Sequence, residues 1–261
     1  MKARPSGTVG KAFRLLDELS HSPTELLPRE LSQQTGLDRT TVYRLLETLL
    51  QIGVVARDAS TGRYRLGLRT LGYASAALDT MEVRHVALSH LIELERDIIL
   101  APDEVECSIF VAVLDGLDVV LVEVGWTRSV FSRTGGRMRF PAYASAAGRC
   151  ILAYMPEAER QQFLGEKHLE PRTPRTLTTV SEILCRLEHI RTLGYDTSDR
   201  EVFPDLVALA VPVLGRSGTA LASIGLSAPA TVTSLERIIE RYSNKLLVAA
   251  QRTGMALRYR D

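Results

Sequence analysis

The chain has 261 residues, of which 45% are hydrophobic and 24% are charged, and its formal net charge is +1. The length favours two domains, the composition is that of a globular protein with an ample core, and the balanced charge alone indicates no particular partner. No apolar run approaches the ~18 residues that span a bilayer, and the charged N-terminus lacks the apolar segment of a signal peptide, so we expect a cytoplasmic protein without membrane contact.

The first predicted helix is Thr8–Leu19, and we expect it to brace the elements that follow. Its broad apolar face consists of Val9, Ala12, Phe13, Leu15, Leu16 and Leu19. Two further helices are predicted within Pro28–Ile52. Gly36 stands where the first of them should end in a left-handed residue. Asp38 precedes the second, and its carboxylate can accept hydrogen bonds from the free N–H groups of the first turn.

The second helix of this pair has two distinct sides. Apolar residues recur at three- and four-residue steps and predict one buried stripe made of Val42, Leu45, Leu46, Leu49 and Ile52. The opposite side begins with guanidiniums and hydroxyls, namely Arg39, Thr40, Thr41, Tyr43 and Arg44. Such a side suits a helix whose first half lies in the DNA major groove, where Arg matches guanine edges. The alternative is an ordinary amphipathic helix with a solvated charged side.

A short hairpin is predicted directly after this helix. Val54–Arg57 can form one strand, and Arg63–Leu66 can form the returning strand. A recognition helix followed by a basic hairpin is the order of a winged helix-turn-helix, which would lay Arg63 and Arg65 along the phosphate backbone. Residues 1–70 carry eleven Lys or Arg against seven Asp or Glu, whereas the remainder carries 21 against 24. A basic head fits a polyanionic partner.

The segment 67–100 keeps a helical period that is interrupted near Asp79–Thr80. We therefore predict a linker helix, a short break and a second helix that opens the next domain. The linker has more apolar surface than one small head needs to bury. Contact with a second copy of the chain is a candidate role for these residues, which are Leu68, Leu71, Ala74 and Leu78.

From residue 105 the hydrophobic period changes to two. It predicts strands at 105–114 and 118–124, and a third at Ser129–Ser132. Helices are predicted at 144–154, after the capping box of Thr179 and Glu182, and after Thr233. Two more strands are predicted between the last two helices, at 206–213 and 219–227. Strands with flanking helices and no strict βαβ repeat indicate an α+β domain.

The sequence shows neither a metal site nor a catalytic motif. Cys107, Cys150 and Cys185 are widely spaced among apolar neighbours and are expected to be reduced core residues. No CxxC or HxxxH pair occurs, so no metal or other cofactor is predicted. The segment GTVGKA lacks the Gly and the Ser or Thr that a phosphate-binding loop needs, and no G-x-S-x-G elbow occurs. We therefore do not expect an enzyme.

Several segments, in this order, resemble the IclR family of bacterial transcription regulators. They include LPRELSQQTGLDRTTVYRLLETLLQIGVVARD, RFPAYASAAGRCILAYMP and RTLGYDTSDREVFPDLVALAVPV. The resemblance covers nearly the whole chain and implies an α+β protein. It implies a winged helix-turn-helix domain at 5–67, a linker helix at 68–81 and a GAF-like effector-binding domain at 82–258. It also implies a homodimer or homotetramer whose heads read a near-palindromic operator.

The resemblance places an effector pocket between the start of the 144–154 helix and the two later strands. Carried over by position, its lining residues are Ala146, Ala147, Ala208, Gly225 and Ser227. The helix start is rich in small residues, and its free N–H groups can bind an anion such as a carboxylate. Arg137 is a further candidate partner for a carboxylate.

This sequence departs from common family members at four positions near the pocket. Asp205 stands where Gly is usual, Ser198 where some members have Asp, Ala208 where some have Cys, and Gly225 where some have Ser. The pocket is therefore predicted to be roomier and less polar than one built for a small oxo acid. RMRFPAYASAAGR also resembles the family's regulators of aromatic-acid catabolism, so we predict an aromatic or bulkier acid.

The sequence thus predicts a DNA-binding transcription regulator that responds to a small organic acid. Two other functions remain open at this point. One is an enzyme of the GAF-like fold that carries a DNA-binding head, which turnover of a candidate ligand would favour. The other is a protein-interaction module that uses the side of Thr41, Tyr43 and Arg44 to bind a partner protein. Footprinting on upstream DNA would separate these functions.

Overall fold

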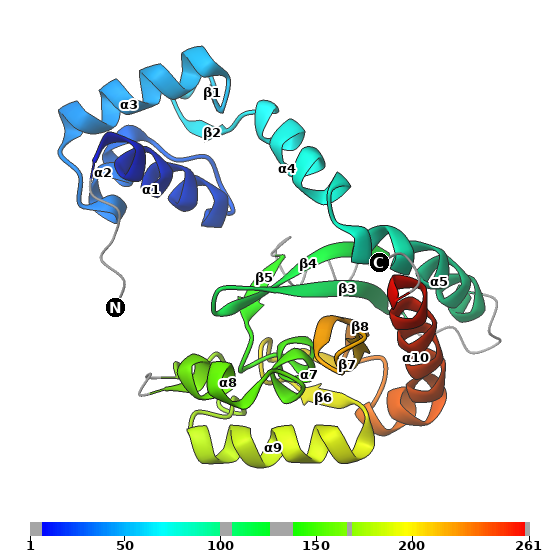
Figure 1. Ribbon diagram of the computed structural model, residues 1–261. Coiled ribbons are helices and arrows are strands. Elements are labelled where there is room, and N and C mark those ends of the chain that lie inside the picture. The colour runs from blue at the N-terminus through cyan, green and yellow to red at the C-terminus, as the bar shows by residue number, and fades with distance from the viewer. Residues whose placement is uncertain (1–6, 100–105, 126–137, 166–168, 259–261) are drawn as a thin grey trace. The chain divides into compact units, whose positions relative to one another are not determined.

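Figure 1 shows the computed structural model, which describes residues 7–99, 106–125, 138–165 and 169–258. The chain divides into two compact units, Met1–Thr80 and Met81–Asp261, and each has its own buried apolar cluster. The predicted strand at Ser129–Ser132 and the candidate Arg137 lie outside the described residues. In the parts of the chain that are described, no helix combines the length and the apolar character needed to cross a membrane.

The first unit is a winged helix-turn-helix domain, as the sequence predicted. Its elements are α1 Thr8–His21, α2 Pro28–Thr35, α3 Arg39–Ile52, β1 Val55–Arg57 and β2 Tyr64–Leu66. The two strands pair antiparallel, with Ala56 opposite Arg65. The hairpin is anchored to the segment before α2, because Leu26 and Tyr64 exchange two backbone hydrogen bonds of 2.9 and 2.8 Å.

The turn between α2 and α3 forms for the local reasons that the sequence indicated. Gly36 ends α2 with φ 69°, a left-handed conformation that glycine adopts without steric cost. Asp38 caps α3, because its carboxylate accepts a 2.9 Å hydrogen bond from the Thr41 N–H. Gly67 is needed for another reason: the chain leaves the hairpin close to the end of α3, and a Cβ at Gly67 would lie 2.3 Å from the Gly53 carbonyl oxygen.

The core of the first unit is smaller than the apolar pattern predicted. The α3 residues that it buries are Val42, Leu45, Leu46 and Leu49. Ile52 is 42% exposed, because α3 ends at this residue, beyond the part of the helix that packs on the core. Val9 and Phe13 are 71% and 61% exposed. They lie on the side of α1 away from Leu15 and Leu19, since Phe13 and Leu15 are about 200° apart around the helix.

Helix α4 (Arg69–Asp79) ends the first unit and α5 (Glu82–Ile99) begins the second, so the predicted interruption of the helical period is observed. No residue of α4 is buried in the chain as described. Leu68, just before α4, is 77% exposed, and Leu71 and Tyr73 within it are 63% and 55% exposed. An isolated helix of this length is only marginally stable in water, and packing of its apolar side against another surface would stabilise it.

The described strands of the second unit form one antiparallel sheet in the order β5-β4-β3-β8-β7-β6. They are β3 Ser108–Asp115, β4 Asp118–Gly125, β5 Arg139–Pro141, β6 Asp196–Asp199, β7 Leu206–Leu214 and β8 Ala220–Pro229. Consecutive residues of β3, β7 and β8 are buried, so both faces of the sheet are covered. This is the α+β architecture that the sequence predicted.

Helices cover the two faces of this sheet. On one face, α7 (Ala146–Ala153) packs on β7 and β8 and is backed by α9 (Val180–Leu193). The other face is covered by α5 and α10 (Leu235–Arg258), which lie side by side (Figure 1). The short α8 (Glu157–Leu164) follows α7. The space between the sheet and α7 holds an apolar cluster, and the functional features of this unit lie at its edge.

Some local predictions for the second unit were wrong. Helix α10 is capped by Ser234 rather than Thr233, because Ser234 Oγ accepts a 3.3 Å hydrogen bond from the Arg237 N–H whereas Thr233 is buried before the helix. Cys185 is exposed, because α9 turns another side to the core, formed by Ile183, Leu187 and Ile190. Strands β5 and β6 and helix α8 were missed, since β5 has three residues and β6 is the polar sequence DTSD.

Candidate nucleic-acid interface and ligand cavity

The outward side of α3 carries five of the residues predicted to contact DNA. Arg39, Thr40, Tyr43 and Arg44 are exposed, and Thr41 is partly buried. Within the described residues, the guanidiniums of Arg39 and Arg44 make no hydrogen bond and no ion pair. Their charge is therefore not neutralised by a neighbouring carboxylate. Unpaired guanidiniums on an exposed helix can bind phosphate oxygens or guanine edges.

The two arginines of the hairpin are placed differently. Arg63 Nη1 donates to the main-chain oxygen of Glu25 at 2.7 Å and to Oε2 of Glu30 at 3.2 Å. Arg65 Nε lies 3.1 Å from Oε1 of Glu25. Both side chains are still 36% and 54% exposed, but their charge is shared with carboxylates that belong to the segment around the start of α2. They brace the hairpin, and their contact with the phosphate backbone stays a prediction.

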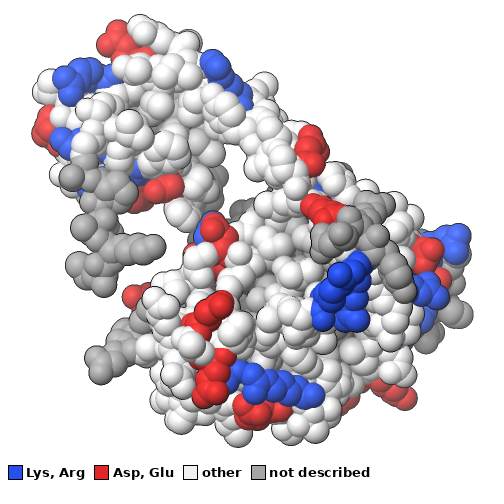
Figure 2. Space-filling view, viewed as in Figure 1, with Lys and Arg blue, Asp and Glu red and all other residues white. Residues whose placement is uncertain are grey.

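The tip of the hairpin is shaped by Asp58. Its Oδ1 accepts hydrogen bonds from the Ser60 N–H at 2.8 Å, the Ser60 hydroxyl at 2.6 Å and the Thr61 N–H at 2.8 Å. These bonds lower the pKa of Asp58 to about 2. The carboxylate therefore stays ionised at neutral pH and keeps the turn closed. Figure 2 shows that Lys and Arg of the first unit are dispersed among Asp and Glu on the visible face rather than gathered in one patch.

The second unit contains a cavity between the sheet and the start of α7. About 750 Å³ of space there is not filled by protein atoms, the open mouth included. Among the described residues that line it, none is charged. The apolar part of the lining is dominated by Phe110, Val119, Leu121, Phe140, Phe203 and Leu206.

One polar strip crosses the floor of this cavity. Ser198, Ala208, Ser227 and Ser108 occupy a single row over the neighbouring strands β6, β7, β8 and β3, because each is the register partner of the next. All four residues line the cavity. As far as the chain is described, the hydroxyls of Ser198 and Ser227 make no hydrogen bond within the protein. They can therefore donate to or accept from a polar group of a ligand.

The start of α7 forms another wall. Ser145 caps the helix by accepting a 3.1 Å hydrogen bond from the Gly148 N–H, and Ala146 and Ala147 follow on the cavity side. Gly148 packs against the segment before the helix so closely that a Cβ would lie 2.3 Å from the Ala142 carbonyl oxygen. The first-turn N–H groups of a helix lack partners within the helix, so this wall can bind an anion.

Four of the six predicted effector-binding residues line the cavity: Ala146, Ala147, Ala208 and Ser227. Gly225, two residues before Ser227 on β8, is not among the lining residues, because the Phe110 ring covers it. A Cβ at this position would be 2.6 Å from that ring and 2.6 Å from the Leu209 carbonyl oxygen. The Phe110 ring occupies the space that Gly225 leaves, so this glycine does not enlarge the cavity. Arg137 lies outside the described residues, and its role in binding an acid stays a prediction.

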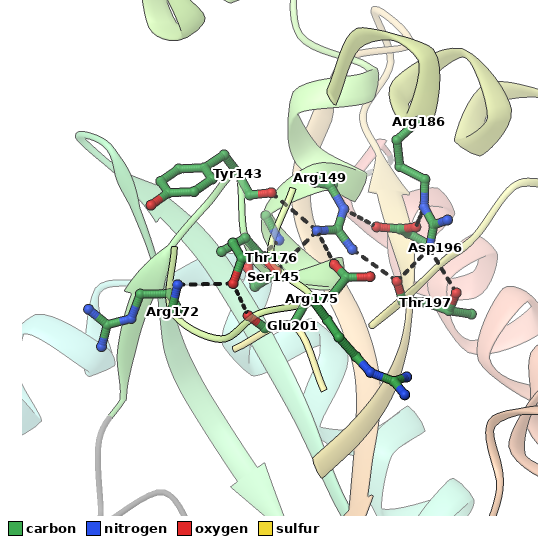
Figure 3. A network of polar contacts seen from close by, with 12 residues as sticks. Tyr143, Ser145, Arg149, Arg172, Arg175, Thr176, Arg186, Asp196, Thr197 and Glu201 are labelled. Atoms are coloured by element: carbon green, nitrogen blue, oxygen red, sulfur yellow. Dashed lines mark hydrogen bonds and ion pairs between the residues drawn. The ribbon is translucent and has the colours of Figure 1, made fainter. Parts of the chain in front are cut away.

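A buried charge cluster beside the cavity was not predicted. Arg149, in the middle of α7, is fully buried, and its Nε lies 2.6 Å from Oδ2 of Asp196 and its Nη1 2.6 Å from Oε2 of Glu201 (Figure 3). Asp196 is also bound by Arg186, whose Nε lies 2.7 Å from Oδ1. The pKa of Glu201 is raised, because the effect of burial exceeds the opposite effect of the neighbouring Arg149. The sequence feature that could have indicated this cluster is a single arginine within the otherwise small and apolar helix sequence AAGRCILA.

The described residues hold no group of three or more His, Cys, Asp or Glu side chains placed to bind a metal ion. Cys150 is fully buried in α7, and burial raises the pKa of its thiol well above the usual value. Its Sγ donates to the main-chain oxygen of Ala210 at 3.2 Å. A thiol kept protonated in this way is a poor nucleophile, so Cys150 acts as a core residue.

Two family models match the chain. The IclR helix-turn-helix domain matches residues 8–59, and the bacterial transcriptional regulator IclR C-terminal domain matches residues 75–254. One relative is the HTH-type transcriptional regulator KdgR of Escherichia coli (strain K12). It is 30% identical over 257 residues, which cover 97% of this chain and 94% of that protein.

Solved structures of this family share the fold. The crystal structure of the Thermotoga maritima IclR matches 96% of this chain and 98% of that chain, with a TM-score of 0.72 and 25% identity. An IclR homolog from Microbacterium hydrocarbonoxydans, complexed with 4-hydroxybenzoate, matches 97% of this chain and 100% of that chain. Its TM-score is 0.74 and its identity is 22%, so this likeness concerns the fold.

Proposed function

Because the chain belongs to the IclR family of bacterial transcriptional regulators, we propose that it binds an operator through α3 and senses a small organic acid in the cavity of its second unit. The observation that carries the proposal is that one chain has two features. Within the described residues, α3 exposes arginines that make no ion pair, and the second unit has a cavity whose described lining carries no charge. Coupling requires that the acid bind one arrangement of the two heads more tightly than another. Such a regulator acts in the cytoplasm, where bacterial DNA is located.

DNA recognition is assigned to the first half of α3. Arg39, Thr40, Thr41, Tyr43 and Arg44 form its outward side, and Arg39 and Arg44 have no partner within the described chain. In a helix-turn-helix domain this part of the second helix faces base edges, and Arg commonly binds guanine O6 and N7. Arg63 and Arg65 are assigned to the phosphate backbone, because both side chains stay partly exposed beside their ion pairs with Glu30 and Glu25.

An aromatic acid is the proposed effector class. Phe110, Phe140 and Phe203 give the cavity aromatic walls, which suit a planar ring. The hydroxyls of Ser198 and Ser227 can bind polar substituents, and the first turn of α7 can bind the carboxylate. A family member of the same fold has been crystallised with 4-hydroxybenzoate, which makes that acid a natural first probe.

A second copy of the chain is the proposed partner of α4. This helix buries none of its residues in the described chain and exposes Leu71 and Tyr73, with Leu68 just before it. Burial of this apolar side in a homodimer would stabilise the helix. A dimer also provides two recognition helices, which read two half-sites about one helical turn of DNA, or a multiple of it, apart.

The test combines footprinting with ligand binding. The purified chain is expected to protect a near-palindromic site on the DNA upstream of its own gene, and an acid that occupies the cavity is expected to change that protection. Candidate acids are screened by thermal shift, since a ligand at a hundred times its dissociation constant stabilises the fold by about 2.7 kcal/mol. Binding of short keto acids alone would overturn the aromatic assignment. Turnover of a bound acid would show an enzyme instead.

A further inference from the structure

The buried guanidinium of Arg149 joins two walls of the cavity. On one side its Nη1 donates to the main-chain oxygens of Tyr143 and Ala144, at 3.2 and 3.0 Å, in the segment that leads into α7. On the other side the same nitrogen lies 2.6 Å from Oε2 of Glu201, in the 200–205 loop between β6 and β7 (Figure 3). The start of α7 and this loop both contribute lining residues.

The 200–205 loop determines one side of the cavity. Val202 and Phe203 line the cavity, and Phe203 makes an edge-to-face contact with Phe140 of β5, with ring centroids 5.6 Å apart. The loop begins with Arg200 at φ 61°, a left-handed conformation that is uncommon for a residue with a side chain. Such a conformation persists where the surrounding contacts fix it.

Contacts from two directions fix this loop. From one side, two threonine hydroxyls donate to main-chain oxygens of the loop. The Thr173 hydroxyl donates to the Arg200 oxygen at 2.7 Å, and the Thr176 hydroxyl donates to the Glu201 main-chain oxygen at 2.6 Å. From the other side, the Glu201 side chain reaches Arg149. Asp196, the other carboxylate on Arg149, lies within β6 and is shared with Arg186, so it does not depend on the loop. Glu201 is thus the link between α7 and the loop.

We infer that Arg149 and Glu201 are positioning residues of the effector cavity. Their ion pair fixes Val202 and Phe203 relative to the start of α7, and so sets the shape that an effector must fit. The inference rests on the proposed function in one respect, namely that this cavity is the effector site. Neither side chain lines the cavity. Both act through the wall residues that they fix.

The experiment uses the full-length chain labelled with 3-fluorophenylalanine, without DNA or added acid. Fluorine NMR then reports on its six phenylalanines, and single Phe→Leu variants assign the signals. Glu201→Ala is expected to shift or broaden the signals of Phe203 and Phe140 and to leave that of Phe13, in the first unit, unchanged. Amide hydrogen exchange of the 200–205 loop is expected to become about tenfold faster, because the ion pair that joins the loop to Arg149 is lost.

Two further variants keep the test interpretable. Glu201→Gln keeps the shape and one acceptor for Arg149, so it should move the Phe203 signal less than Glu201→Ala does, and it replaces that variant if Glu201→Ala does not fold. Glu188→Gln is the matched control, because it makes the same change at a carboxylate of α9 that lies in an exposed ion pair with Arg191. It should leave the Phe203 signal in place.

An unchanged Phe203 signal in a folded Glu201 variant would overturn the inference. So would an equal shift in the Glu188→Gln control, since the loss of any carboxylate of this unit would then have the same effect. The outcome is separate from that of the proposed function. If the signals move as expected but no acid binds and no DNA is protected, the positioning role stands and the sensor role fails. If an acid binds but the Phe203 signal does not move, the sensor role stands and the positioning role fails.

Discussion

Helices α3 and α7 begin in the same way and use their arginines in opposite ways. Asp38 caps α3 by accepting from the Thr41 N–H, and Ser145 caps α7 by accepting from the Gly148 N–H. In both helices the bonded N–H is three residues after the cap. Yet the arginines of α3 are exposed and unpaired in the described chain, whereas Arg149 of α7 is fully buried between two carboxylates.

The difference shows what decides the role of an arginine. The cap is a local feature, so the same residue types at the same spacing produce it in both units. The partner of the guanidinium comes from elsewhere in the chain, and for Arg149 it is supplied by Asp196 and Glu201, about fifty residues later. A charge without an internal partner remains available to a ligand such as DNA. A buried and paired charge instead fixes the elements around it.

The largest effect expected from this comparison is on stability. Arg149→Met should lower the free energy of unfolding by about 3–5 kcal/mol, because it leaves two buried carboxylates with part of their pairing lost. Arg44→Ala, on the exposed side of α3, should change it by less than about 0.5 kcal/mol. Urea denaturation of both variants measures the difference. A loss of less than about 1 kcal/mol for Arg149→Met would show that the buried cluster contributes no more than a surface contact.

In DNA binding, an exposed arginine of α3 should matter more than an arginine that is already in an ion pair. Arg44→Ala should weaken binding to the operator by about 1–3 kcal/mol, the usual worth of a contact with one base pair, and should weaken binding to random DNA less. Competition binding at one fixed salt concentration measures both losses. Arg63→Ala is the comparison variant, because Arg63 is already paired with Glu30 and should lose less operator affinity. Equal losses on both DNAs for Arg44→Ala would reduce its role to a phosphate contact.

Features that depend on neighbouring residues were predicted from the sequence better than contacts between residues far apart in the chain. The turn at Gly36, the Asp38 cap and the winged hairpin depend on neighbouring residues, and all were predicted. The cluster around Arg149 depends on residues in β6 and the following loop, and a polar strand such as β6 carries no alternating apolar pattern. The family resemblance identified part of the cavity wall. It could not show that the Phe110 ring fills the space beside Gly225.

The two caps offer a smaller test. Ser145→Ala should lower the free energy of unfolding by about 1 kcal/mol, because the Gly148 N–H would lose its acceptor in a buried position. Asp38→Ala should destabilise the first unit less, because Asp38 is exposed and water can replace the lost acceptor. Thermal unfolding of both variants measures the order. The reverse order would show that the exposed cap of α3 matters more to the fold than the buried cap of α7.

The smallest expected effect is a difference in pH dependence. Hydrogen bonds from Thr41 hold the pKa of Asp38 below its ordinary 3.8, so its contribution to stability is present above that pH and is lost as the pH falls through the lower folded value. Burial instead raises the pKa of Glu201 above 4.5. The folded state then binds the proton more tightly than the unfolded state, so stability is greatest below pH 4.5 and is lost as the pH rises through the raised value.

Glu201→Gln separates these two contributions, because it removes the titration of Glu201 and leaves that of Asp38. Between about pH 4.5 and 7, the wild type should lose stability relative to the Gln variant as the pH rises. Urea midpoints measured across this range provide the comparison. If the wild type instead gained stability relative to the variant, the charge of Arg149 would outweigh burial, and the pKa of Glu201 would be lowered. The pair would then stabilise the fold by its own attraction, in addition to fixing the loop.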